Sequence, residues 1–249
     1  MIGTGFPMVD LDDRPPGVAR IGGLATWLDA RTNRGLTLDA ALTTTVAALG
    51  DPVGGWVDQS GSGAHAVQLT GLKRPVWTAN RINGAPALSF NGAGMCLQIP
   101  SIDLPTEFTL LAVVREASAT NTFFVEHGPN ATANDGFFLY GRGQGPAGIR
   151  RGTFSGAAVN ADWVGATACV VGLDYAPGRL RYTKNGLSSG QVTVTATSAN
   201  VAAALNIGAR NQASLYFNGD LGELAVWRRA LSDPELAYAV ASLRARWGI

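Results

Sequence analysis

Asn-Gly dipeptides constrain the fold of this chain more than any other feature of its sequence. They occur four times, at Asn83, Asn91, Asn185 and Asn218, and at least three of them lie between short runs of β-forming residues. A type I′ turn needs a positive φ at both central residues, and Asn followed by Gly meets that requirement best. The spacing therefore predicts antiparallel hairpins along much of the chain.

Short β-like runs with turn residues between them continue almost to the C-terminus. They span residues 24–28, 76–79, 86–90, 95–99, 107–115, 122–126, 136–140, 148–154, 167–173, 179–184, 190–196, 204–208 and 215–227. In the run EFTLLAVVR, alternate residues from Phe108 to Val114 form one apolar face, and Leu111 and Val113 form the other. Because both faces are apolar, both are expected to be covered. The pattern predicts an all-β fold, a two-sheet antiparallel jelly-roll sandwich.

One short α-helix is expected to close the chain, over residues 233–246. Ser232 and Glu235 have the spacing of a capping box, and Leu231 and Leu236 have that of a hydrophobic staple. The residues that share one apolar face of this helix are Leu236, Ala239, Val240, Leu243 and Trp247. We therefore expect the helix to dock on the sandwich by that face and to cover apolar surface that the sheets leave open.

Two other segments are less regular. Residues 36–48 could form a helix or an irregular loop, because the threonines at 43–45 weaken the helical pattern. Residues 1–23 contain Gly, Pro and a small acidic cluster without apolar periodicity, and are expected to form an extended N-terminal arm. The domain organisation predicted is this arm followed by a single domain over residues 24–249.

Charge and composition exclude several classes of partner. The formal net charge is only +1, so no nucleic-acid partner is expected. No apolar run approaches the roughly 18 residues of a membrane helix, and the N-terminal residues lack the pattern of a signal peptide. We expect no membrane insertion and no export by the usual route. Cys96 and Cys169 both lie in apolar runs and are expected to be buried free thiols.

Several stretches, in order, resemble a known family. They are LATWLDA (24–30), GGWVDQSGSGAHAVQ (54–68), RPVW (74–77), INGAPALSFNGAGMCLQI (82–99), RLRYTKNG (179–186), LNIGARN (205–211) and the closing stretch FNGDLGELAVWRRALSDPELAYAVASLRARWGI (217–249). The chain resembles the laminin-G-like branch of the concanavalin A-like lectin and glucanase jelly rolls, in the form found in bacteriophage virion proteins. The resemblance covers residues 24–249 and implies two curved antiparallel sheets. The family includes lectins, adhesion modules and, in other branches, glycosidases.

The sequence gives little support for an enzyme. The hydrolytic branch of that superfamily carries its acids as Glu-x-Asp-x-x-Glu, and no such motif occurs. Asp220 and Glu223 are three residues apart, so they would point to opposite faces on a regular strand and to one face only if a bulge lies between them. We expect Asp220 to set a turn after Asn218-Gly219 and Glu223 to bond to backbone. His65 and His127 adjoin no nucleophile elbow, and GQGPAGIRRG (143–152) is not a phosphate-binding loop.

Two kinds of binding site are candidates. Relatives of this fold hold Ca²⁺ through hard oxygen ligands at the sheet rim, and Asp58, Asp135 and Asp220 could supply them. No other cofactor is expected. The stretch HGPNATANDGFFLYGRGQG (127–145) should form loops at one end of the sandwich and could bind a glycan. Its candidate ligand-binding residues are Asn130, Asn134, Asp135, Tyr140, Arg142 and Gln144.

The expected function is that of a non-enzymatic phage structural protein displayed on the virion surface, as a head decoration or a tail component. The arm, residues 1–23, would bind other virion proteins, the protein could form homo-oligomers, and it could contact a host-surface glycan. The alternative is a carbohydrate-binding adhesion or receptor-binding module. A distant alternative is a polysaccharide-degrading enzyme.

Overall fold

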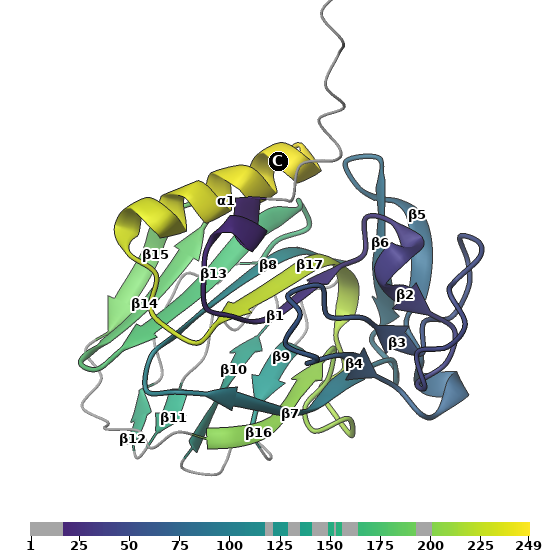
Figure 1. Cartoon of the computed structure of the whole chain (residues 1–249), viewed down its shortest axis with the longest axis horizontal. Helices are drawn as coiled ribbons and strands as arrows, with labels where there is room; N and C mark the ends of the chain where they lie inside the picture. The colour runs from purple at the N-terminus through teal and green to yellow at the C-terminus, as the bar shows by residue number, and fades with distance from the viewer. Residues whose placement is uncertain are drawn as a thin grey trace, which may run out of the picture.

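The computed structural model describes residues 17–117, 122–128, 135–140, 149–151, 153–155, 164–192 and 201–249. Two antiparallel sheets stack face to face, and a single long helix lies across the outer side of one of them (Figure 1). This arrangement confirms the predicted jelly-roll sandwich with a C-terminal helix. Among the described residues, no helix is both long and apolar enough to span a bilayer.

Sheet A, which carries the helix, has the strand order β15-β14-β13-β8-β17-β6-β5, and β1 pairs with β17 beside this path. Its strands are β1 (Leu24–Asp29), β5 (Val76–Ile82), β6 (Ala85–Asn91), β8 (Phe108–Glu116), β13 (Cys169–Ala176), β14 (Arg179–Lys184), β15 (Leu187–Val192) and β17 (Asn218–Trp227). Strands β8 and β17 lie near the middle of the order and pair with each other over most of their length.

Sheet B lies below sheet A in Figure 1 and has the order β12-β11-β10-β9-β16-β7-β4-β3-β2. Its strands are β2 (Leu36–Thr37), β3 (Gly55–Trp56), β4 (Ala66–Val67), β7 (Leu97–Leu104), β9 (Phe123–His127), β10 (Asp135–Tyr140), β11 (Ile149–Arg151), β12 (Thr153–Ser155) and β16 (Val201–Ile207). The short strands β2 to β4 lack any strong alternation in the sequence and escaped prediction.

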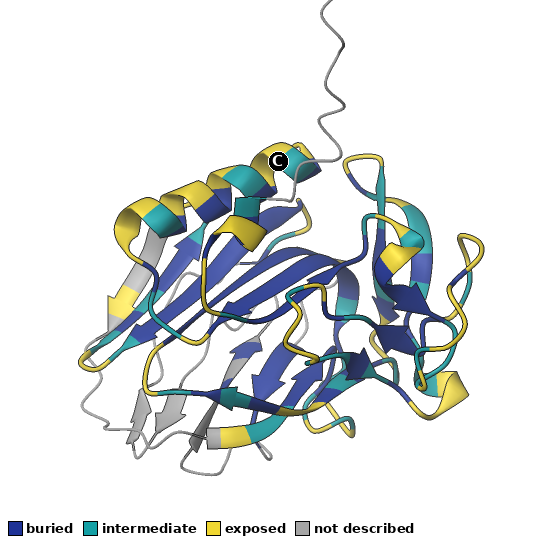
Figure 2. Cartoon of the chain, in the orientation of Figure 1, coloured by how far each residue is buried: buried dark blue, intermediate teal, exposed yellow. Residues whose placement is uncertain are grey.

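Sheet A has an apolar core on each side, as Figure 2 shows by the continuous burial of its central strands. Alternate residues of β8, from Phe108 to Val114, belong to the core between the sheets. Leu111 and Val113 belong to a second core between sheet A and the helix. The two-faced pattern of this strand in the sequence is thus confirmed, and the helix supplies the second cover.

The helix α1 spans Asp233–Trp247, one residue longer than predicted. Ser232 and Glu235 form both hydrogen bonds of the capping box, and Gly248 ends the helix with a φ of 65°. The five residues of the predicted apolar face are the buried residues of the helix. Leu231 and Leu236 are also buried, as expected for a staple.

Two of the four Asn-Gly dipeptides form the expected hairpins. Asn83 has a φ of 45° and Asn185 has a φ of 51°, each is followed by a glycine with positive φ, and they join β5 to β6 and β14 to β15. Asn91 instead ends β6, and Asn218 begins β17 with its glycine inside the strand. The hairpin prediction at Asn218 is therefore wrong, because that dipeptide is paired on both sides by β6 and β8.

The structure describes all of one of the two less regular segments and the end of the other. Residues 38–48 form turns, because Asp39 accepts hydrogen bonds from the backbone N–H groups of Thr43 and Thr44 and so competes with a helix. In the predicted arm, residues 1–16 lie outside the described residues. Gly17–Arg20 form a short 3-10 helix, and Val18 and Ile21 are buried in the core under α1. The last part of the arm therefore packs with the domain.

Candidate functional site

Two of the six sequence-predicted glycan residues, Asp135 and Tyr140, belong to sheet B. Asp135 begins β10 and Tyr140 ends it, and β10 pairs with β9. The side chains of these two residues lie outside the described part of the structure. Asn130, Asn134, Arg142 and Gln144 lie outside it altogether, in residues 129–134 and 141–148. The prediction of a glycan-binding rim therefore stays a prediction. The described strand that pairs with β10 on this side is β9.

A chain of polar side chains crosses the strands that lie beside β10. Gln98 on β7, Asn206 on β16 and Glu126 on β9 are paired directly across neighbouring strands. Gln98 Nε2 donates to Asn206 Oδ1 at 2.8 Å, and Asn206 Nδ2 donates to Glu126 Oε2 at 2.9 Å. Their strand neighbours Leu205 and Ile207 point into the core, so alternation places this row on the outer face of sheet B.

The loop between β16 and β17 adds backbone groups to this row. Asn211 donates its backbone N–H to Glu126 Oε2. Asn211 and Gln212 have φ values of 46° and 53°, and Leu215 has 49°, so three non-glycine residues of one loop occupy the left-handed region. Such strained residues often concentrate at binding sites. We call Gln98, Glu126, Asn206 and Asn211 the amide cluster.

Neighbouring segments hold the strained loop in place. Lys73 Nζ and the Tyr216 hydroxyl both donate to the backbone carbonyl of Gln212, at 3.1 Å each. Gln68 Nε2 donates to Gln212 Oε1 at 3.2 Å. The segment of Gln68 and Lys73 therefore holds the loop from outside, and Tyr216 holds it from within.

Glu126 is the charged centre of the amide cluster and is fully buried. Burial raises its pKa above the ordinary value, while hydrogen bonds from Asn211 and Asn206 and the nearby Arg210 oppose that shift. Its Oε1 atom accepts no hydrogen bond within the described residues. The buried Glu126 fixes the orientation of Asn206 and, through it, of the half-buried Gln98, whose amide can donate to and accept from the hydroxyls of a neutral ligand. The only sequence signal for this site is a polar residue within a mostly apolar strand, Glu126 in FFVEH and Asn206 in LNIG.

The two described calcium candidates do not fit a metal site. Asp58 accepts hydrogen bonds from the backbone N–H groups of Trp27, Ser60 and Gly63 and from the hydroxyls of Ser60 and Ser62, at 2.8–3.0 Å. Burial opposes ionisation of Asp58, but these hydrogen bonds lower its pKa below the ordinary value. Donors around both oxygens occupy the lone pairs that Ca²⁺ would need. In the W-x-D-x-S-G block, this aspartate therefore organises a turn.

Asp220 lies elsewhere and is likewise surrounded by donors. Its two oxygens accept from Arg81, Arg115 and Ser89 at 2.6–2.9 Å. Across the described residues, no group of three His, Cys, Asp or Glu side chains is placed to hold a metal ion. Asp220 sets no turn, which corrects the expectation from the sequence, because it sits inside β17 and not beyond it.

β17 is not a regular strand here but contains the bulge that would bring the two carboxylates to one face. The register of β17 against β8 shifts between Leu221 and Glu223, while Leu221 and Leu224 both belong to the inner core. Asp220 and Glu223 therefore share the outer face of sheet A. The sequence predicted a hydrogen bond between Glu223 and backbone, but its hydrogen-bond partners among the described residues are side chains. Its oxygens accept from the indole N–H groups of Trp27 and Trp247, at 2.7 Å each.

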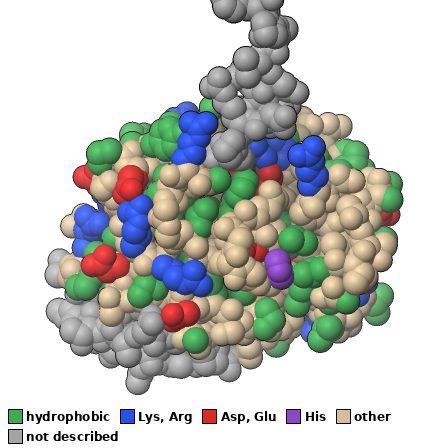
Figure 3. Space-filling view, in the orientation of Figure 1, with side chains coloured by type: hydrophobic (Ala, Val, Ile, Leu, Met, Phe, Trp, Pro, Cys, Tyr) green, Lys and Arg blue, Asp and Glu red, His purple; other side chains and the backbone are tan. Residues whose placement is uncertain are grey.

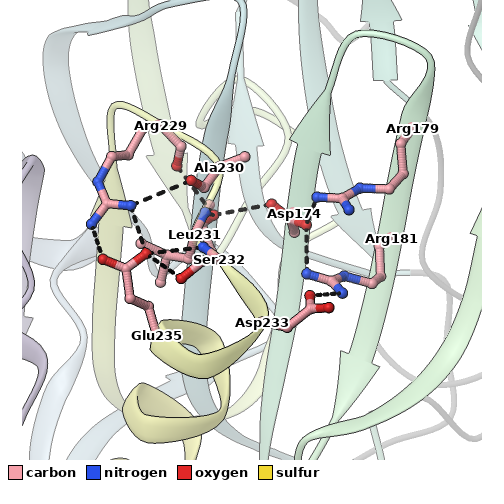
Figure 4. Close-up of polar contacts among 10 residues, drawn as sticks. Asp174, Arg179, Arg181, Arg229, Ala230, Leu231, Ser232, Asp233 and Glu235 are labelled. Carbon is pink, nitrogen blue, oxygen red and sulfur yellow. Dashed lines mark hydrogen bonds and ion pairs between the residues drawn. The ribbon is translucent and has the colours of Figure 1, made fainter.

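The start of α1 carries another ionic network. Figure 4 shows Arg179 and Arg181 on β14 reaching toward Asp174 on β13, and Arg181 also reaching Asp233. The Arg–Asp distances are 2.6–2.9 Å. Side chains of both signs accordingly lie next to each other on the left of the face drawn in Figure 3. The network contains two arginines and two aspartates, so it leaves no excess charge. Because Asp233 is the first residue of α1, the network also joins the helix to sheet A.

The remaining sequence candidates have structural positions. His65 Nδ1 accepts the backbone N–H of Asp58, and His127 is buried with its ring stacked 5.5 Å from that of Phe137. Cys96 and Cys169 are buried free thiols, as predicted.

Comparison with known families gives one match. The family described as "Concanavalin A-like lectin/glucanases superfamily" matches residues 91–237, more than half of the chain. A search of curated protein sequences finds no match.

Solved structures with a similar fold contain domains of carbohydrate-active proteins. Domain 4 of AbnA, a GH43 extracellular arabinanase from Geobacillus stearothermophilus, in complex with arabinotriose, is 16% identical with a TM-score of 0.54, over 88% of this chain and 98% of that domain. A Trypanosoma rangeli sialidase is 15% identical with a TM-score of 0.52, over 90% of this chain. This chain spans only 33% of that sialidase. A GH54 α-L-arabinofuranosidase is 13% identical with a TM-score of 0.55, over 79% of this chain and 51% of the enzyme. At these identities, the likeness shows the fold alone.

Proposed function

The chain belongs to the concanavalin A-like lectin/glucanases superfamily, and from that premise we propose that it is a non-enzymatic carbohydrate-binding domain. The observation that carries the proposal is the amide cluster, in which Glu126, Asn206 and Gln98 form one hydrogen-bonded row. Sugar hydroxyls both donate and accept, so the half-buried amide of Gln98 and the exposed amide of Asn211 suit them, and the buried Asn206 and Glu126 orient both residues. The cluster also adjoins β10, where the sequence places glycan-binding residues.

Domain 4 of AbnA adds support from a relative. Its structure is in complex with arabinotriose, and it overlaps this chain over nearly its whole length. A single domain of this size can therefore be a complete sugar-binding unit in a relative. We propose the same role here, on the outer face of sheet B.

Binding without hydrolysis is the second part of the proposal. Glycoside hydrolysis needs two carboxyl groups about 5–10 Å apart across one cleft. The described partners of Glu126 are the amide of Asn206 and the backbone N–H of Asn211, whereas Asp58, Asp220 and Glu223 are each enclosed by their own donors. Among its described partners, Glu126 therefore has no second carboxyl group, which supports binding without hydrolysis.

A glycan array followed by calorimetry on the strongest hit tests the proposal, with arabinotriose as one defined probe. We expect wild-type protein to bind at least one neutral oligosaccharide and Gln98→Ala to weaken that binding about fivefold or more, since one oriented hydrogen bond is worth about 1 kcal/mol or more. Gln191→Ala, at an exposed amide on β15, is the matched control and should bind like wild type. Equal affinity of the Gln98 and Gln191 variants would contradict the assigned site.

Hydrolysis is tested on the same oligosaccharide. We expect no release of reducing ends during prolonged incubation with wild-type protein. Release that disappears in Glu126→Gln or in Glu223→Gln would overturn the non-enzymatic part of the proposal.

We propose further that this domain is displayed on a phage virion and that residues 1–16 contact other virion proteins. The support is the family resemblance of the sequence together with the anchoring of residues 17–21, since Val18 is fully buried beneath α1. Residues that precede such a fixed point can bind a neighbouring protein and so attach the domain to it. Mass spectrometry of purified particles should find the chain in stoichiometric amounts, and its absence from particles would exclude this placement.

A further inference from the structure

Two arginines converge on one buried carboxylate on the outer face of sheet A. Arg115 on β8 pairs in register with Asp220 on β17, and Asp220 pairs with Ser89 on β6. Arg81 reaches the same carboxylate from β5, where the register shifts between Thr78 and Ile82. The row therefore crosses four neighbouring strands of sheet A.

Every lone pair that Asp220 offers is directed at this row. Its Oδ1 accepts from Arg81 Nε at 2.7 Å and from the Ser89 hydroxyl at 2.6 Å. Its Oδ2 accepts from Arg115 Nε at 2.9 Å and from Arg115 Nη2 at 2.6 Å. Asp220 is fully buried, so it binds the two guanidinium groups on their inner side, toward the sheet.

The outer parts of both guanidinium groups remain open to a ligand. The side chains of Arg81 and Arg115 are 33% and 30% exposed. Among the described residues, Arg81 Nη1 and Nη2 and Arg115 Nη1 have no acceptor. Two guanidiniums share one carboxylate, so the row carries an excess positive charge that an anion could balance.

The network at Asp174 shows what a balanced arrangement looks like in the same sheet. There, too, two arginines bind one buried aspartate, but Asp233 adds a second carboxylate to Arg181 at 2.6 Å (Figure 4). The charge of that network is neutralised within the chain. The Asp220 row has no such second acid among its described ion pairs.

We infer that Arg81 and Arg115 form a second ligand site that binds the carboxylate of an acidic sugar. The assignment of a sugar rests on the proposed carbohydrate-binding function. Planar guanidinium groups match a carboxylate by paired hydrogen bonds, and Asp220 and Ser89 act as positioning residues that fix the forks. The site lies on the opposite outer face of the sandwich from the amide cluster.

NMR titration of the whole protein tests this inference with three probes: D-galacturonate, D-galactose as its neutral counterpart, and acetate as a carboxylate without a sugar. We expect galacturonate to bind at least tenfold more tightly than galactose or acetate. Arg81→Gln and Arg115→Lys should each reduce galacturonate affinity about tenfold, because each loses part of the charge-assisted pairing. Arg179→Gln, in the balanced network, is the matched control and should leave the affinity unchanged.

Each other outcome overturns part of the inference. Equal binding of acetate and galacturonate would remove the sugar from the assignment, and unchanged affinity in both Arg81→Gln and Arg115→Lys would remove the site. If Arg115→Lys fails to fold, Arg81→Gln on the edge strand decides alone. Loss of neutral-glycan binding in Gln98→Ala reports on the proposed function separately, since that residue lies on the other sheet.

Discussion

Substitution of Gly222 by alanine should loosen the docking of α1 on sheet A. Gly222 lies in the bulge of β17, and a Cβ atom added there would lie 2.7–2.9 Å from three ring carbons of Trp247. Ordinary carbon contacts are about 3.5–4.0 Å, so the ring or the bulge must move by roughly 1 Å. Trp247 is 2% exposed and its indole N–H donates to Glu223 at 2.7 Å. The substitution therefore both overpacks the site and breaks a buried hydrogen bond.

The expected cost combines these two effects. Overpacking costs about 1–3 kcal/mol, and a buried N–H without a partner costs about 1–3 kcal/mol. We expect Gly222→Ala to lower the free energy of unfolding by about 2–6 kcal/mol and Tm by about 4–24 °C for a chain of this size. Urea unfolding followed by far-UV circular dichroism measures the first quantity, and a thermal scan measures the second.

Gly71→Ala is the matched control for this experiment. Gly71 has no heavy atom within 4 Å of the added Cβ, and its φ is not in the left-handed region. This variant should lie within about 0.5 kcal/mol of wild type. If Gly222→Ala is as stable as Gly71→Ala, the close contact with Trp247 does not hold the helix, and the reasoning is refuted.

Three further predictions follow from buried groups. Burial, with Asp29 adding to it, raises the pKa of Glu223 to about 7, above its ordinary 4.5. Between these two pH values the folded chain holds a proton that the unfolded chain has lost. The free energy of unfolding should therefore fall by up to about 3 kcal/mol as the pH rises from 4.5 to about 7. Glu223→Gln should flatten this slope in urea titrations at different pH values. Cys96 and Cys169 are buried and burial raises the pKa of both thiols, so DTNB should react with them only after denaturation, and rapid native reaction would contradict their burial. Asp58→Asn should cost about 2–3 kcal/mol of unfolding free energy, because its new N–H₂ group would face N–H and O–H donors, and wild-type stability would show that those donors find other acceptors.

The sequence determined the elements whose signals are local. The capping box at Ser232 and Glu235, the staple leucines and the apolar stripe of α1 are all set by spacing along the chain, and the structure contains each of them. The alternation in β8 likewise predicted burial on both faces. These features depend on neighbours a few residues away, so periodicity and turn chemistry suffice to predict them.

The tertiary structure decided what depends on residues far apart in the chain. The bulge at Gly222, against which Trp247 packs, inserts one residue into β17 and so turns Asp220 and Glu223 to the same face. The partners of Asp220 come from positions 81, 89 and 115, and the amide cluster joins positions 98, 126, 206 and 211. Strand order brings these residues together, and no local pattern encodes strand order. The sequence by itself therefore determined the family and the closing helix, whereas the pairing of distant strands determined which polar groups meet on each outer face.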